Sequence, residues 1–480
     1  MSNRRLFAKR LLVGSSFTAL AALLVPAPAA AQNALDMGLG PAKIGDDYFL
    51  RLNLGGAVAT PALPLPLPSS WFDAEPSAPL KVGFYVPLSF RLTGEGDLFR
   101  ADEWDEPGEI LRTVRWAEIG QRYGAVRLRV GELVDWSVGH ATIMSGYNNS
   151  LDLDHFSWGV GGEINTKMGG VELMVGDVVD PSVMGGRVYV RPLFFTGGPS
   201  FFDRLAVGAS VITDTHAPKE LKLETTTNSS GDVVVTGKYV QDKNGDLIVE
   251  TESAATVMGI DAELPLLPPG DFVLTPYTDI NKISGAGTGL HTGVFLGWQA
   301  PANISIGGRA EYRVLGKDYL PSYIGPVYGV ERSAYLPVTN DLGLETAQKY
   351  PKREWLAKSD VKASDGYLTE LNADVMGIVR VQAQYATSAD DQATGEFVSR
   401  ATINAGDAAQ IGVYYARSGL SEISEIGDLK DALVVAEAKV PLNSFLYLTA
   451  QGNRRWQLDD KGEYQPNDEY SFSVGASLGF

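Results

Sequence analysis

The stretch VGFYVPLSFRL at residues 82–92 alternates apolar and more polar positions along its whole length. Its apolar positions are every second residue from Val82 to Leu92, which is the period of a β-strand with one apolar face. Eleven residues is also the length with which a tilted strand crosses a bilayer. The stretch therefore predicts a membrane-spanning β-strand.

The same alternation recurs at intervals along the chain, around residues 126–130, 304–314, 379–385 and 446–453. A soluble β-sandwich would alternate as well, so the lengths of the connections between strands have to distinguish the two folds. Short connections, such as 301–303 and 441–443, alternate with connections that are mostly longer. Short periplasmic turns and long extracellular loops give that rhythm in membrane barrels. The pattern predicts an all-β fold, a transmembrane antiparallel β-barrel of about 18 strands, with 16 inside the counting error.

The chain closes on YSFSVGASLGF at residues 470–480, another alternating stretch. Its apolar face ends on an aromatic residue and includes Tyr470, Phe472, Val474, Leu478 and Phe480. This stretch resembles the C-terminal signal of bacterial outer-membrane β-barrel proteins, in which a last strand closing on Phe is read by the assembly machinery. The resemblance is porin-like and points to no subfamily. It implies an outer-membrane location, with the assembly machinery, outer-membrane lipid and lipopolysaccharide, and small polar solutes as partners.

The N-terminus has the features of an export signal. Arg4, Arg5, Lys9 and Arg10 precede an apolar run, and three alanines end it. This predicts a signal peptide at residues 1–31 and no transmembrane helix in the mature chain. Residues 32–79 are rich in proline, which cannot donate to a central ladder, so we expect a periplasmic or lumenal segment there. A true additional strand at 47–57 is the alternative. The barrel is expected to occupy residues 80–480.

The expected extracellular loops are 94–109, 133–155, 214–254 and 317–365. The last holds several aromatic residues and either folds inward to narrow a pore or caps the surface. The net charge is −18, and near −22 without the four positive charges of the signal peptide, which argues against a nucleic-acid partner. There is no cysteine, so no disulfide is expected.

The polar faces of the strands collect a basic set of residues that we expect to line the lumen: Arg91, Arg127, Arg129, Arg187, Arg191, Arg309, Glu311, Arg313 and Arg380. One interpretation is an arginine ladder that faces acidic loop residues across a pore and sets a field on polar solutes. The other is a set of structural ion pairs that fill a closed lumen. The corresponding functions are a porin-like channel for small polar solutes, or a non-channel barrel with a structural or adhesion role.

Catalysis is not expected. His140 and Ser145 share an expected loop with Asp152 and Asp154, which could form a hydrolase site, but no nucleophile motif surrounds them. No phosphate loop, zinc spacing or dinucleotide fingerprint is visible, so the sequence predicts no cofactor and no metal. The acidic loop 94–109 lacks a calcium-ligand spacing and is interpreted as a solvated loop.

Overall fold

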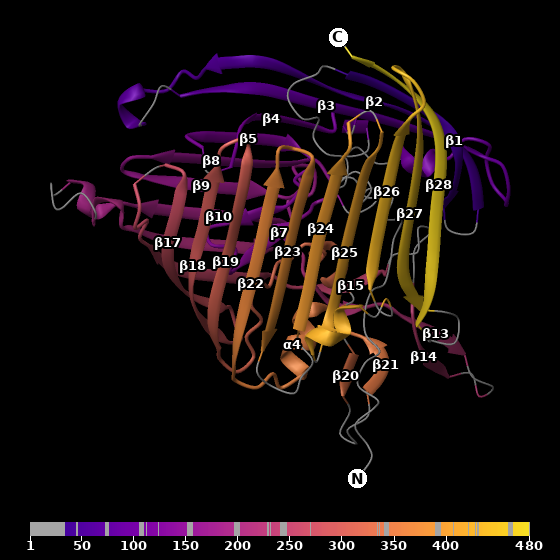
Figure 1. The fold of residues 1–480 in the computed structure, drawn as a ribbon. Coiled ribbons are helices and arrows are strands. Elements are labelled where there is room, and N and C mark those ends of the chain that lie inside the picture. Colours follow the sequence, from indigo (N-terminus) through magenta and orange to yellow (C-terminus); the bar gives the residue numbers. More distant parts are fainter. Residues whose placement is uncertain are drawn as a thin grey trace.

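The computed structural model describes residues 34–44, 47–72, 76–104, 110–111, 113–122, 124–150, 157–195, 202–227, 230, 232–240, 247–268, 270–333, 335, 337–339, 345–388, 395–406, 408–420, 422–427, 429, 432–458 and 464–479. The fold is a single barrel seen from the side in Figure 1. No helix among these residues is long and apolar enough to span a membrane.

Twenty strands form one sheet, and each pairs with its neighbours in the antiparallel sense. The first half comprises β1 (Ala34–Ile44), β2 (Asp47–Pro64), β3 (Ser77–Arg91), β4 (Trp116–Gly120), β5 (Val126–Gly131), β8 (Gly159–Thr166), β9 (Gly169–Val175), β10 (Val183–Val190), β11 (Ala206–Asp214) and β16 (Ala255–Glu263). The second half comprises β17 (Phe272–Ile283), β18 (Thr288–Ala300), β19 (Ile304–Leu315), β22 (Ser364–Val375), β23 (Val379–Ser388), β24 (Gly395–Asn404), β25 (Gln410–Leu420), β26 (Leu433–Pro441), β27 (Leu446–Leu458) and β28 (Tyr464–Gly479).

The sheet closes on itself because β28 pairs with β27 on one side and with β1 on the other. The close approach of β1 to β28 requires glycine at position 40, where a Cβ atom would lie 1.9 Å from the carbonyl oxygen of Phe472. The predicted all-β antiparallel barrel is confirmed. The number of strands is 20 and not about 18.

The two additional strands, β1 and β2, lie in the segment that the sequence placed outside the barrel. Proline was the reason for that expectation, but the proline-rich part falls at the end of β2. A register shift between Ala59 and Ala62 accommodates Pro61 there. Residues 47–57 pair without interruption with β1, and residues 49–57 also do so with β3, as the alternative interpretation required.

The connections between barrel strands alternate in length, as predicted. Those at the end that carries the C-terminus are mostly short, for example residues 301–303 between β18 and β19. At the opposite end are the longest ones, including the segment 316–363 between β19 and β22 (Figure 1). These connections contain short elements of their own: β6 (Trp136–Val138), β7 (Met144–Tyr147), β12 (Pro218–Leu221), β13 (Leu223–Thr227), β14 (Val233–Tyr239), β15 (Val249–Glu252), β20 (Pro337–Thr339), β21 (Glu345–Lys349), α3 (Tyr328–Glu331) and α4 (Lys352–Lys358).

The outer face of the barrel is apolar. Alternate residues that point outward are exposed and include Val188, Ile260, Leu296 and Leu371. Their neighbours in sequence point inward and are buried, as Asp261 is beside Ile260. A closed barrel leaves no unpaired strand edge, so this apolar surface can face lipid at every strand.

Candidate functional site

Two of the long connections fold into the barrel and occupy part of its lumen. The first carries the hairpin β6–β7, and the second is the first part of the segment 316–363, around Ile324, whereas β20 and β21 of that segment project beyond the end of the barrel (Figure 1). The two meet where Met144 forms a bridge with Ile324, and Ser145 N–H donates to the Ile324 carbonyl at 3.0 Å. A barrel of 20 strands is too wide for wall side chains to fill, so its lumen has room for these segments.

An apolar cluster holds these segments against the inner wall. Trp136 from the hairpin and Tyr319, Tyr323 and Tyr328 from the segment 316–363 are almost fully buried in it. The aromatic loop therefore folds inward, which was one of the two predicted alternatives. Glycines on the inner wall make room for two of these rings. A Cβ at Gly161 would lie 2.4 Å from the Trp136 ring, and one at Gly289 would lie 2.2 Å from Tyr319.

A cavity of about 120 Å³ remains between the hairpin and the opposite wall. Its lining on the hairpin side includes Asp135, Ser137, His140 and Ser145. On the wall side it includes residues of β23, β24 and β25, among them Gln382, Gln384, Arg400 and Tyr414. The cavity is therefore polar on both sides, with an acid on the hairpin and a base on the wall.

Arg400 differs from the other inward arginines of the barrel. Among the residues that the structure describes, it has no hydrogen-bond or ion-pair partner, although Asp135 acts on it electrostatically. The amide groups of Gln382 and Gln384 are likewise without a partner in the described part of the chain. These groups are available to a molecule that enters the cavity.

His140 fixes the hairpin to the wall. Its Nδ1 lies 2.9 Å from Asp279 Oδ1 on β17, and its Nε2 lies 3.0 Å from Glu263 Oε2 on β16. The ring stacks on Tyr277 with 4.4 Å between centroids. Burial alone would lower the pKa of His140, but the hydrogen bonds to Asp279 and Glu263 outweigh burial and raise it to about 9. His140 is therefore an imidazolium at neutral pH.

Arg127 and Arg129, predicted to line the lumen, point inward from β5 but are paired within the wall. Arg127 Nε binds Glu118 of β4 at 2.8 Å, and its Nη1 binds Glu163 of β8 at 3.2 Å. Arg129 binds Glu118 at 2.8 Å. The Trp136 ring lies over the Arg127 guanidinium at 4.4 Å. The hairpin thus covers Arg127, whose charge is compensated by its neighbours on the same wall.

Arg187, Arg309, Glu311 and Arg313 are buried behind the inserted segments. Arg187 of β10 binds Asp261 through Nε at 3.0 Å and Nη2 at 2.5 Å. Glu311 binds Arg313 at 2.5 Å, His291 at 3.0 Å and the Tyr277 hydroxyl at 2.6 Å. Arg309 pairs with Glu370 of β22 at 3.2 Å. These contacts correspond to the structural ion pairs of the second interpretation.

The remaining predicted arginines lie nearer the two ends of the barrel. Arg91 pairs with Asp47 at the start of β2, and Arg380 pairs with Asp374 at 2.6 Å beside a short turn. Arg191 binds Asn165 and the backbone carbonyl of Thr166. Of the predicted set, only Arg309 lines the cavity.

The possible hydrolase arrangement is not formed around His140. Both of its ring nitrogens are bonded to carboxylates of the wall, so neither is bonded to the Ser145 hydroxyl. Asp152 and Asp154 lie outside the described residues. The predicted terminal signal lies on β28, where Tyr470, Phe472, Val474 and Leu478 all point outward and are exposed, whereas Phe480 is outside the described residues.

Sequence reasoning missed Arg400, Asp279 and the cavity itself. Arg400 stands in GEFVSRATIN, where an apolar–polar alternation is visible but one arginine gives no sign of being unpaired. Asp279 stands in TPYTDINKI, in the middle of β17, and its inward direction could have been read from the period of two. Its contact with His140, 139 residues away, could not.

No protein-family model and no curated protein matches the chain. Among solved structures it is similar to Wzi of Escherichia coli, described as a carbohydrate-binding β-barrel involved in capsule assembly (10% identity, 94% of this chain, 85% of that chain, TM-score 0.32). It is also similar to a BenF-like porin from Pseudomonas fluorescens, with 7% identity over 94% of this chain and 98% of that chain and a TM-score of 0.33. A third similar structure is OccK2 of Pseudomonas aeruginosa in complex with glucuronate, with 7% identity over 94% of this chain and 98% of that chain and a TM-score of 0.34. At these scores the likeness carries no argument about function.

The structures it resembles are bacterial outer-membrane β-barrels, and no single subfamily is singled out. The barrel itself supplies the physical argument for location. Its strands leave no open edge, and a continuous apolar face surrounds a polar interior. Such a barrel is stable in a bilayer, because every strand hydrogen bond is satisfied within the sheet. The protein is located in the bacterial outer membrane.

Proposed function

We propose that the protein is a porin-like channel for the passive passage of small polar solutes. The observation that carries this proposal is the polar cavity inside the barrel, with Asp135 of the hairpin in its lining and Arg400 of β24, which has no hydrogen-bond or ion-pair partner in the described part of the chain. Opposite charges across a narrow passage orient a polar solute and lower the cost of its desolvation. A barrel that only supported a surface structure would have no need of a guanidinium that faces a cavity without an ion-pair partner among the described residues.

The direct test is electrical. Purified protein in planar bilayers is expected to give discrete current steps in salt solution, and vesicles that contain it should swell in neutral sugars below a size limit. Arg400→Gln is the matched variant, since it removes the cavity charge and keeps a polar side chain. A protein that inserts into bilayers but gives neither current steps nor swelling contradicts the channel proposal.

The alternative function is a non-channel barrel with a structural or adhesion role at the cell surface. The observation in its favour is the apolar cluster that fills part of the lumen, with Tyr319, Tyr323 and Trp355 among its members. If the inserted segments block the passage, deletion of residues 317–362 should create current steps that the complete chain lacks. Current steps in the complete chain exclude this alternative.

We also propose that β28 carries the assembly signal. Its outward aromatic and aliphatic face supports this, because the signal would have to be read before the strand pairs with β1. Phe480→Asp is expected to lower the outer-membrane level of the protein several-fold in cells, measured by fractionation and immunoblotting. Phe480→Tyr is the control. Equal levels of the Asp variant and the unmodified chain contradict the proposal.

A further inference from the structure

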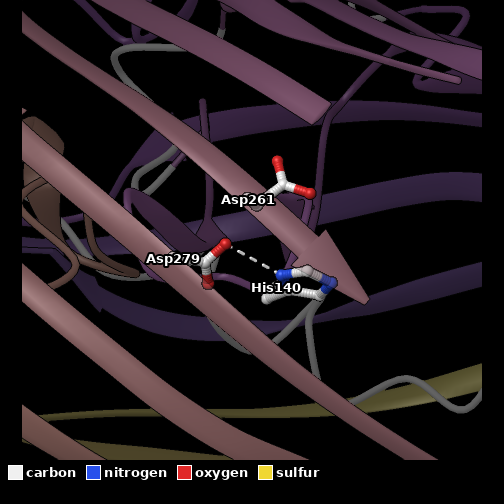
Figure 2. Close-up of side chains that lie close together, drawn as sticks. All are labelled: His140, Asp261 and Asp279. Carbon is white, nitrogen blue, oxygen red and sulfur yellow. Dashed lines mark hydrogen bonds and ion pairs between the residues drawn. The ribbon is translucent and has the colours of Figure 1, made fainter. Parts of the chain in front are cut away.

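We propose that His140, Asp261 and Asp279 form a binding site for a divalent transition-metal ion, of the Zn²⁺ type, between the lumen hairpin and the barrel wall. Each residue offers one ligand atom, and these atoms all lie within 4.8 Å of one another. Figure 2 shows the three side chains grouped together, with Asp279 bonded to the His140 ring. This inference does not depend on whether the barrel conducts.

The three residues come from separate parts of the chain and are all buried. His140 follows β6 in the hairpin, Asp261 lies on β16 and Asp279 on β17. Their exposed fractions are 4%, 7% and 3%. Burial in a rigid wall fixes the directions of both carboxylates, which is what a preorganised ligand set requires.

An independent observation points to a missing cation. Asp279 Oδ2 is buried, and within the described part of the chain it has no hydrogen-bond partner. A buried carboxylate oxygen without a partner is unfavourable, because it has lost its water and gained no hydrogen bond in return. A metal ion bound to Asp279 would compensate that charge directly.

The local charge also favours a cation. Two more carboxylates lie beside Asp261 and Asp279. Glu263 of β16 binds His140, and Glu172 of β9 binds Arg187. The arginines next to these four acids are Arg187, which binds Asp261 and Glu172, and Arg191, which acts electrostatically on Glu263. Arg309 lies behind them and donates to the His140 carbonyl at 2.5 Å. Once His140 has lost its proton, four carboxylates face three arginines.

Arg187 orients the Asp261 carboxylate and leaves it able to bind a metal ion. Its two bonds to Asp261 engage both carboxylate oxygens, and each oxygen keeps a second lone pair. Carboxylates that bind metals are commonly held by a hydrogen bond from a neighbouring residue in this way. Glu263 Oε2, 3.0 Å from His140 Nε2, is placed to act as a further ligand or as the orienting group of the imidazole.

The donor set selects the class of metal. The metal binds a neutral imidazole, so the ion displaces the proton of His140 Nδ1 to solvent and takes the place of its hydrogen bond to Asp279. One imidazole nitrogen with two or three carboxylates suits Zn²⁺ and Co²⁺, whereas Ca²⁺ takes six to eight oxygen ligands. An ion held by His140 and the two wall aspartates would connect the hairpin to the barrel and restrict its motion. We therefore expect metal binding to raise the thermal stability of the hairpin against the wall.

The experiment is calorimetric titration of purified, chelator-treated protein in detergent with Zn²⁺, repeated with Co²⁺ followed by its visible absorption. One ion per chain is expected, and Ca²⁺ at the same concentrations should give no binding heat. Asp279→Asn should weaken Zn²⁺ binding at least about tenfold, because even residues outside the ligand shell commonly cost 10- to 100-fold. Full-affinity binding in this variant, or no binding in the unmodified chain, overturns the proposal.

Two variants separate this site from other histidines. His291→Gln removes a buried histidine that binds Glu311 and Tyr319 on the same wall, and it should leave Zn²⁺ affinity unchanged. His216→Gln removes a half-exposed histidine near Asp180, and loss of binding there would show that Zn²⁺ binds at the surface. Heat-modified gel mobility reports whether each variant folds. If Asp279→Asn does not fold, His140→Gln provides the decisive titration.

Discussion

Two parts of the inner wall have the same kind of sequence and different surroundings. The paired wall, formed by the inward residues of β10 and β16–β19, holds Arg187, Asp261, Glu311 and Arg313 in ion pairs beneath the inserted segments. The cavity wall, formed by the inward residues of β23–β25, holds Gln382, Gln384, Arg400 and Tyr414 beside the cavity. A charge that points into the lumen is therefore available to solutes only where no chain segment covers it.

The difference has an energetic cause. On the paired wall the hairpin and the segment 316–363 exclude water, so each charge there needs a partner with good geometry. Glu311, whose side chain is fully buried, has Arg313 at 2.5 Å, His291 at 3.0 Å and the Tyr277 hydroxyl at 2.6 Å. On the cavity wall Arg400 is only partly buried and can keep water in place of a partner.

The largest expected effect comes from breaking the paired wall. Glu311→Gln removes the anion that Arg313 and His291 share, and the residual buried positive charge should lower the free energy of unfolding by about 3–5 kcal/mol. Urea unfolding in lipid vesicles measures this. Arg400→Gln serves as the control and should change stability by less than about 0.5 kcal/mol. Equal stability of the two variants would mean that the walls do not differ as described.

A smaller effect tests which face of the paired wall meets lipid. Ile260 points outward from the middle of β16 and is 60% exposed, next to the inward Asp261. Ile260→Arg should destabilise the barrel by about 2–4 kcal/mol, because a guanidinium near the centre of the bilayer loses its water. Ile260→Leu is the matched control and should be close to neutral. If the arginine is tolerated as well as leucine, Asp261 does not face the lumen.

The sequence predicted the wall of the barrel well and its contents poorly. Side chains along a strand point alternately to its two faces, so the sequence itself places Arg309 and Arg313 inward and Tyr312 outward. The direction of a strand residue is a local property. The number of strands was underestimated because Pro61 and its neighbours concealed β2, although only the end of that strand is irregular.

The site depends on contacts that no local pattern encodes. His140 meets Asp279 only because the hairpin enters the lumen, and the hairpin enters because Gly161 leaves room for Trp136. A glycine in a strand can also mark a bulge or a weak position, so the sequence alone does not show that Gly161 makes room for the Trp136 ring. The same limit applies to Arg400, which is distinguished by an absent partner among the described residues and not by its type.

The smallest change in stability and the most informative change in function are expected at Arg400. In a salt gradient, Arg400→Gln should shift the reversal potential towards cation preference, because it removes from the cavity lining a positive charge that has no ion-pair partner among the described residues. Arg127→Gln should shift it less, since Arg127 lies outside that lining and beneath the Trp136 ring. The difference between the two variants should shrink in concentrated salt, where the Debye length falls from about 10 Å at 0.1 M to about 3 Å at 1 M. Equal shifts for both variants would show that solutes sense the ion-paired Arg127 of β5 as strongly as Arg400 of the cavity wall.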